Sequence, residues 1–177
     1  SIAIIDTGFC IRALSKNYPK IIFKEIYDAT ETNTQDACTL SEDHPRLHGQ
    51  EVTKIFLENF KDASVTIYPL TVFDKNGIQS IEAWNKAFNW VVKNNINMVL
   101  TASGFPHKNK LSSYPQLPII TFAPAGRIER MIKRDTLLYP QLLAPHEKLF
   151  VIGSYDERGI DSHTLYKDVV DYYLPSE

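Results

Sequence analysis

Ile2-Ala3-Ile4-Ile5-Asp6-Thr7-Gly8 is an apolar run that ends in a single carboxylate and a Thr-Gly turn. A continuous apolar run, rather than an alternating one, is typical of a strand buried on both faces of a parallel sheet. Sites in open parallel sheets form at the carboxyl ends of the strands, so Asp6 is the first candidate for a functional residue. Taken alone, however, an Asp before Thr-Gly is more often a turn or cap residue than a catalytic one.

Further apolar segments follow, with helical patterns between them. Ser80 is the natural N-cap of an amphipathic helix with Trp84 and Phe88 on one stripe, and a second helix begins near His48 or Gly49. The apolar stripe of this second helix, expected to face the core, consists of Val52, Ile55, Phe56 and Phe60. Strands that alternate with helices predict an α/β fold: a doubly wound, mostly parallel sheet of about six or seven strands with helices on both faces. The polar region 29–47 is expected to be a long surface loop. The expected strands are Ser1 to Asp6, Ile21 to Ala29, Ser64 to Phe73, Ile96 to Ser103, Pro118 to Ala123, Lys148 to Tyr155 and Asp168 to Leu174.

Length and composition exclude several classes of protein. A chain of 177 residues and 20.2 kDa suits one domain, 1–177, and 44% hydrophobic with 23% charged residues is typical of a globular protein rather than a disordered one. A net charge of -2 gives no reason to expect nucleic acid or an anionic membrane as partner, and the apolar runs are too short to span a bilayer. The spacing of Cys10 and Cys38 matches no metal motif and favours two free thiols, with one bridge left open.

His48-Gly49 opens the second helix, where a histidine can point into a cleft. Asp6-Thr7-Gly8 on a strand, followed by His48-Gly49 and Val52 on a helix, resembles the two signatures of the subtilase family of serine peptidases. Gln50 replaces the Thr that is usual in the second signature. The resemblance continues through the later strands and helices and covers nearly the whole chain.

The resemblance implies a subtilisin-like fold and a role for each motif. Asp6 would orient the imidazole of His48, and His48 would be the general base that takes a proton from a serine hydroxyl. The backbone of Ala102, Ser103 and Gly104 would be the edge along which an extended peptide or protein segment binds as an added strand. No Gly-rich phosphate motif is present, and two side chains are too few for a metal, so no cofactor and no metal are expected.

Three features depart from the family pattern. Besides Gln50, Arg127 follows Ala125-Gly126 at the oxyanion position, where the family has an Asn. The chain ends at Glu177, before the Gly-Thr-Ser motif that carries the nucleophile, so the domain is expected to lack the serine-bearing segment. Ser162 has no long apolar helix behind it and is interpreted as a turn residue.

Together these departures favour a non-catalytic pseudopeptidase that binds a peptide or protein. The alternative is the N-terminal part of an active serine endopeptidase whose serine lies on a removed or separate segment. Without the serine-bearing helix, apolar sheet surface would be left uncovered, which favours a protein partner or a homo-oligomer. The compartment stays open.

Overall fold

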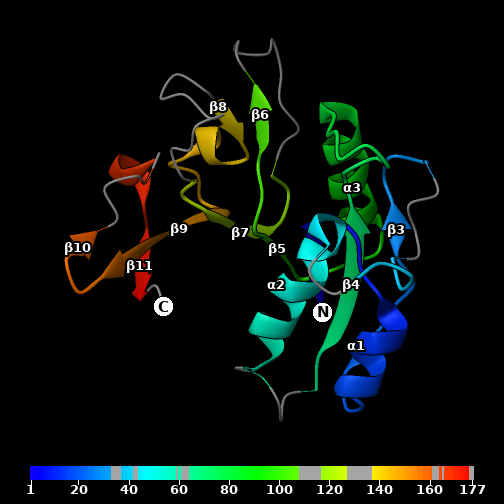
Figure 1. The fold of residues 1–177 in the computed structure, drawn as a ribbon. Helices are drawn as coiled ribbons and strands as arrows, with labels where there is room; N and C mark the ends of the chain where they lie inside the picture. Colours follow the sequence, from blue (N-terminus) through cyan, green and yellow to red (C-terminus); the bar gives the residue numbers. More distant parts are fainter. Residues whose placement is uncertain are drawn as a thin grey trace.

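The computed structural model describes residues 1–32, 37–41, 44–58, 60, 64–107, 117–126, 137–160, 164 and 166–175. Its centre is a mostly parallel sheet in which seven strands follow one another in the order β10-β9-β7-β5-β1-β4-β2, while β3 pairs with β4 and β11 with β9 (Figure 1). The fold class expected from the sequence is therefore confirmed. The strands are β1 Ile2–Asp6, β2 Ile22–Phe23, β3 Tyr27–Asp28, β4 Thr66–Thr71, β5 Met98–Thr101, β7 Ile120–Pro124, β9 Leu149–Asp156, β10 Gly159–Ile160 and β11 Tyr172–Pro175, with β6 Phe105–His107 and β8 Leu137–Tyr139 forming a separate pair.

Helices cover both faces of this sheet. Side chains alternate along β1, so that Ala3 and Ile5 face α3 (Ile81–Lys93) while Ile2 and Ile4 face α1 (Ile11–Asn17) and α2 (His48–Glu58). Ser80 caps α3 as expected, because its hydroxyl oxygen accepts a hydrogen bond from the backbone N–H of Ala83. Three short 3₁₀ helices, η1 Pro45–Leu47, η2 Gln141–Leu143 and η3 Lys167–Val169, complete the described elements.

The connections over the α1–α2 face have an unusual handedness. The chain passes outward from β1 through α1 to β2 and returns through α2 to β4, with both helices on the same face of the sheet. Two crossovers that run in opposite directions over one face have opposite hands, so one of them is left-handed. Such crossovers are rare in parallel sheets, which makes this topology a specific mark of the fold.

Several local expectations need correction. The segment from Ile21 to Ala29 is not one strand: β2 and β3 both pair with β4, but they are separated by irregular backbone at residues 24–26. Cys10 and Cys38 are not free thiols, since they form a disulfide bond that ties the region after β3 to the start of α1. That region is also not purely a surface loop, because Ala37 and Leu47 pack against Cys10.

The buried face of α2 agrees only in part with the expected one. Val52 and Phe56 of the apolar stripe pack against the core cluster, but the fully buried side chain of the last turn is Leu57. Ile55 is 63% exposed and Phe60 is 46% exposed. Ile55 of α2 and Phe60, which follows the helix, therefore lie outside the described core.

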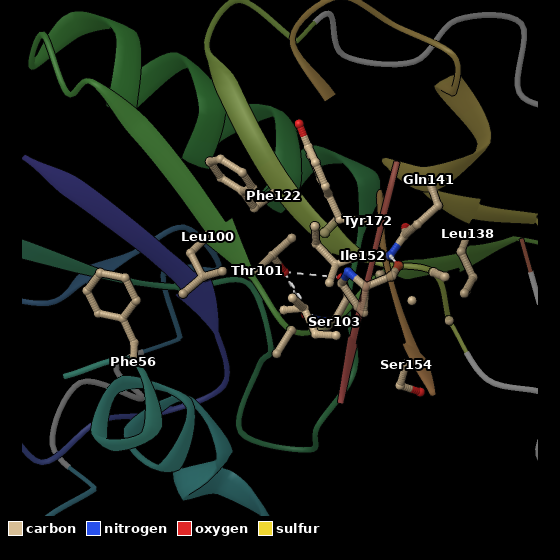
Figure 2. A pocket seen from close by; sticks show the side chains of 18 of the residues that line it. Phe56, Leu100, Thr101, Ser103, Phe122, Leu138, Gln141, Ile152, Ser154 and Tyr172 are labelled. Carbon is tan, nitrogen blue, oxygen red and sulfur yellow. Dashed lines mark hydrogen bonds between the residues drawn. The ribbon is translucent and has the colours of Figure 1, made fainter. Parts of the chain in front are cut away.

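The α1–α2 face of the sheet is covered only in part. A cavity of about 1200 Å³, which we call the apolar cavity, lies over β5, β7, β9 and β11 beside α2. Figure 2 shows Phe56 of α2 on one side of it, and Leu100, Phe122 and Ile152 on β5, β7 and β9. Among the described residues, no helix is long and apolar enough to cross a membrane.

Candidate active site

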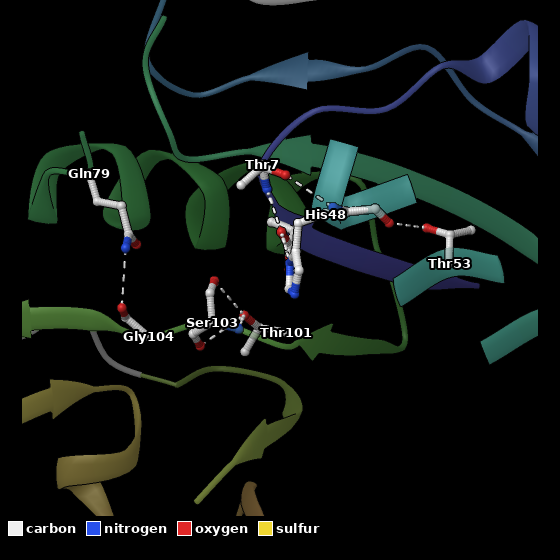
Figure 3. A network of polar contacts seen from close by, with 9 residues as sticks. Thr7, His48, Thr53, Gln79, Thr101, Ser103 and Gly104 are labelled. Carbon is white, nitrogen blue, oxygen red and sulfur yellow. Dashed lines mark hydrogen bonds and ion pairs between the residues drawn. The ribbon is translucent and has the colours of Figure 1, made fainter. Parts of the chain in front are cut away.

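Asp6 and His48 meet at the end of β1. Asp6 is the last residue of β1 and His48 the first residue of α2, and Oδ1 of Asp6 lies 2.7 Å from Nδ1 of His48 (Figure 3). The same oxygen accepts a hydrogen bond of 2.7 Å from the backbone N–H of Thr7. The two candidate residues are thus within direct contact, as a joint role requires.

The two side chains have very different environments. Asp6 is fully buried, whereas the side chain of His48 is 51% exposed. The hydrogen bond to Asp6 raises the pKa of His48 above its ordinary value of 6.5, against the opposing effect of partial burial. Because a carboxylate only accepts, Nδ1 carries the proton of the neutral ring, which leaves Nε2 as the nitrogen able to take a proton from a reactant.

Two glycines allow this close approach. A Cβ atom on Gly49 would lie 2.8 Å from the ring of Phe9 and 3.0 Å from Cβ of Asp6. A Cβ atom on Gly8 would lie 2.5 Å from the carbonyl oxygen of Arg46, which accepts a hydrogen bond from the N–H of Gly8. Both signatures therefore need glycine for packing, whatever the chemistry.

Thr7 adds a contact that sequence reasoning did not assign. Its hydroxyl oxygen accepts a hydrogen bond of 3.0 Å from the backbone N–H of Gly49 at the start of α2. The contact satisfies one of the free donors at the helix N-terminus and ties α2 to the Asp6 turn. In the sequence, the only indication of a role for Thr7 was its position between Asp6 and Gly8 in the first signature.

Gln50 has a structural role. Its side chain is buried, and Oε1 accepts a hydrogen bond of 2.9 Å from the backbone N–H of Cys10. The amide thus satisfies a buried donor at the N-cap of α1, 40 positions away in sequence. This contact gives the residue that replaces the usual Thr a structural role of its own.

The expected peptide edge follows β5 directly. The hydroxyl of Thr101 donates to the carbonyl of Ser103 and accepts from its N–H, each at 3.1 Å, so the backbone of Ser103 is satisfied internally. Ala102 is exposed and Gly104 half-buried. Binding of a peptide by these three residues stays a prediction. Arg127 and Ser162 lie outside the described residues.

Two cavities meet at Ser103. A cavity of about 420 Å³, which we call the His48 cavity, is lined by His48 and Arg46 on one side and by Phe73, Gly77 and Ser103 on the others. Ser103 also lines the apolar cavity. The exposed imidazole and the apolar cavity therefore lie on two sides of one residue. The described part of the chain contains no cluster of three or more potential metal ligands.

Comparison with models of protein families gives no match, and neither does comparison with curated proteins. Solved structures do match. The crystal structure of a lanthipeptide protease aligns with a TM-score of 0.68 and 14% identity, over 98% of this chain and 54% of that chain. A mutant of the protease domain of PatA aligns with a TM-score of 0.63 and 12% identity, over 99% of this chain and 66% of that chain.

A third match is the psychrophilic subtilisin-like protease Apa1 from the Antarctic psychrotroph Pseudoalteromonas sp. AS-11. It has a TM-score of 0.59 and 15% identity, over 99% of this chain and 41% of that chain. Identities this low establish the fold alone, and that fold is subtilisin-like. The chain spans between 41% and 66% of the length of these three proteins.

Proposed function

We propose that this chain supplies the orienting carboxylate, Asp6, and the general base, His48, of a subtilisin-type serine endopeptidase whose nucleophilic serine lies on a segment outside these residues. The observation that carries the proposal is the 2.7 Å contact between a fully buried carboxylate and a half-exposed imidazole. A structural histidine at a helix start needs neither a buried carboxylate partner nor an exposed ring.

The chemistry follows from this geometry. Nε2 of His48 takes the proton of the serine hydroxyl as the serine oxygen attacks the peptide carbonyl carbon. The ring becomes an imidazolium, which the carboxylate of Asp6 stabilises and holds in orientation. His48 then gives the proton to the leaving amine, the C–N bond breaks, and water releases the acyl group in a second, equivalent cycle.

The apolar cavity supports a serine on a further segment. Its lining is mostly apolar along β5, β7, β9 and β11 and at Phe56 of α2, which is unusual for a surface that faces water. The cavity reaches Ser103, which lies beside His48 in the second cavity, so an apolar helix seated there can bring one end to the imidazole. The greater length of the matched proteases leaves room for such a segment.

A second candidate is a non-catalytic protein that binds an extended peptide. Arg127, at the position where the family has an oxyanion-stabilising Asn, favours it, because its longer side chain would occupy substrate space. Gln50 no longer favours it, since the hydrogen bond to Cys10 accounts for this residue.

Labelling with a fluorophosphonate separates the two candidates. The native protein is expected to react at one serine, and the reaction should be lost in a His48→Ala variant, which cannot activate the hydroxyl. A Glu58→Ala variant, at an exposed position near the end of α2, is the matched control and should label normally. Absence of labelling in the native protein, together with saturable binding of extended peptides, would favour the non-catalytic candidate.

A further inference from the structure

A hydrogen-bonded bridge runs from the core to the expected peptide edge. The indole N–H of Trp84 donates to Oε1 of Gln79 at 2.8 Å, and Nε2 of Gln79 donates to the carbonyl oxygen of Gly104 at 3.2 Å. Figure 3 shows Gln79 reaching Gly104 next to Ser103 and His48. Gln79 lies just beyond Gly77, and Gly104 just beyond Ser103, and both Gly77 and Ser103 line the His48 cavity.

The orientation of the Gln79 amide is fixed by its partners. An indole N–H can only donate, so the amide oxygen must face Trp84 and the NH₂ group must face Gly104. Trp84 is fully buried in the core cluster of α3, which anchors this end of the bridge. The turn before Gln79 is held by Asp74, whose Oδ1 accepts from the N–H groups of Asn76 and Ile78 at 2.8 Å each.

The bridge occupies a group that a bound peptide needs. The backbone of Ser103 is already satisfied by Thr101, so a strand that adds to this edge must pair with Ala102 and Gly104. A peptide N–H paired with Gly104 would compete with the Gln79 amide, which now donates to this carbonyl oxygen. A peptide confined to Ala102 leaves the bridge intact.

We propose that Gln79 is a specificity-determining residue that penalises long extended peptides, because a peptide reaching Gly104 competes with the Gln79 amide for its carbonyl oxygen. The inference rests on the proposed peptide cleft beside His48. Peptides that pair only with Ala102 keep their full affinity. A peptide long enough to pair with Gly104 loses part of the affinity that the additional hydrogen bond would add. One hydrogen bond of ordinary strength, about 1 kcal/mol, corresponds to about fivefold in affinity.

The test measures how tightly blocked peptides of two, four and six residues bind to the full-length protein. All the proteins compared carry His48→Ala, so that no peptide is cut. Fluorescence anisotropy gives the affinities. Gln79→Ala and Gln79→Glu variants are expected to bind the four- and six-residue peptides about fivefold more tightly, with the dipeptide unchanged. Gln79→Glu keeps an acceptor for Trp84 and lacks the donor for Gly104, so it separates the bridge from the support of the indole.

The indole N–H resonance of Trp84 gives an independent readout. In the protein with Gln79, the six-residue peptide should shift this resonance and the dipeptide should not, while the resonance of Trp90 serves as an internal control. Equal effects on short and long peptides, weaker binding of long peptides by the variants, or an unmoved Trp84 resonance would each overturn the inference. If labelling succeeds while the three proteins bind all peptides alike, the proposed function survives and the role of Gln79 does not.

Discussion

The neutral imidazole of His48 is the form that can take a proton, and its pKa is raised mainly by the hydrogen bond to Asp6. Activity should therefore fall on the acid side of a pKa above 6.5, where the ring is protonated. Asp6→Asn removes the charge that favours the imidazolium, so the pKa of His48 should fall and the acid limb should move to lower pH. The maximal rate should drop by several orders of magnitude, about 10⁴-fold, because an Asn amide can donate to Nδ1 and so favours the tautomer that carries its proton on Nε2. The pH profile of kcat/KM and an NMR titration of His48 measure both effects.

Glu51 provides the matched control for this prediction. It also raises the pKa of His48, but as the last of the contributing causes, so Glu51→Gln should give a much smaller shift. The raised pKa of His48 also makes the stability of the fold depend on pH. The ion pair between Asp6 and protonated His48 contributes fully below about pH 6.5, and this contribution is lost as the pH rises through the pKa of His48 in the folded protein. An unchanged His48 titration in Asp6→Asn would contradict the geometry.

Gln50 offers a direct test of whether a departure from the family pattern reflects lost chemistry. Gln50→Thr restores the usual residue but shortens the side chain, so the buried N–H of Cys10 loses its acceptor. We expect a loss of about 1–3 kcal/mol in the free energy of unfolding and no gain in activity. Denaturant unfolding and peptidase assays measure these. A more active Gln50→Thr variant would show that Gln50 does impair the site.

The disulfide joins two segments beside Asp6 and His48, the candidate catalytic residues. Cys10 follows the Asp6 turn and caps α1, and Cys38 lies in the connection that leads to His48. A closed loop with a sequence separation of 28 should contribute about 3.6 kcal/mol through the entropy of the unfolded chain. Reduction, or a Cys10→Ala/Cys38→Ala double variant, should lower the free energy of unfolding by about this amount. The double variant should no longer respond to reductant, and equal stability with and without the bond would contradict this account.

Local sequence patterns predicted the helices and strands well where interactions within one element determine its structure. β4, β5 and α3 follow from apolar runs, an N-cap and a helical stripe, all of which act within one element. The break between β2 and β3 and the buried face of α2 depend on neighbours far away in sequence. Periodicity shows that a helix has an apolar face, but it does not reveal which of its apolar residues a partner covers.

The candidate site also contains residues that local motifs predict and contacts that they do not predict. Asp6 and His48 were identified because each lies in a short motif at a strand or helix end. The bridge through Gln79 and the contact of Gln50 with Cys10 join segments that only the folded chain brings together, and nothing in the spacing of these residues indicates them. The disulfide was missed because two cysteines in one chain carry no pairing signal.

The partly covered sheet gives a test of the complete protein. Leu174 and Ile160 are both 55% exposed, but Leu174 lines the apolar cavity and Ile160 lies on the β10 hairpin, outside its lining. If a further segment seats on the cavity, Leu174 is buried in the native protein, and Leu174→Ser should cost about 2 kcal/mol of unfolding free energy. Ile160→Ser should stay within about 0.5 kcal/mol, as exposed substitutions usually do.

Denaturant unfolding of the full-length protein and of each variant gives the two losses of unfolding free energy, which are then compared. The comparison is matched, since both substitutions remove a branched aliphatic side chain of equal exposure from a strand near one end of the sheet. A difference near 2 kcal/mol would mean that the apolar cavity is an internal surface, which supports a serine-bearing segment as its occupant. Equal and small effects would mean that the cavity faces solvent, and the proposed position of the serine would then be wrong even if Asp6 and His48 act together.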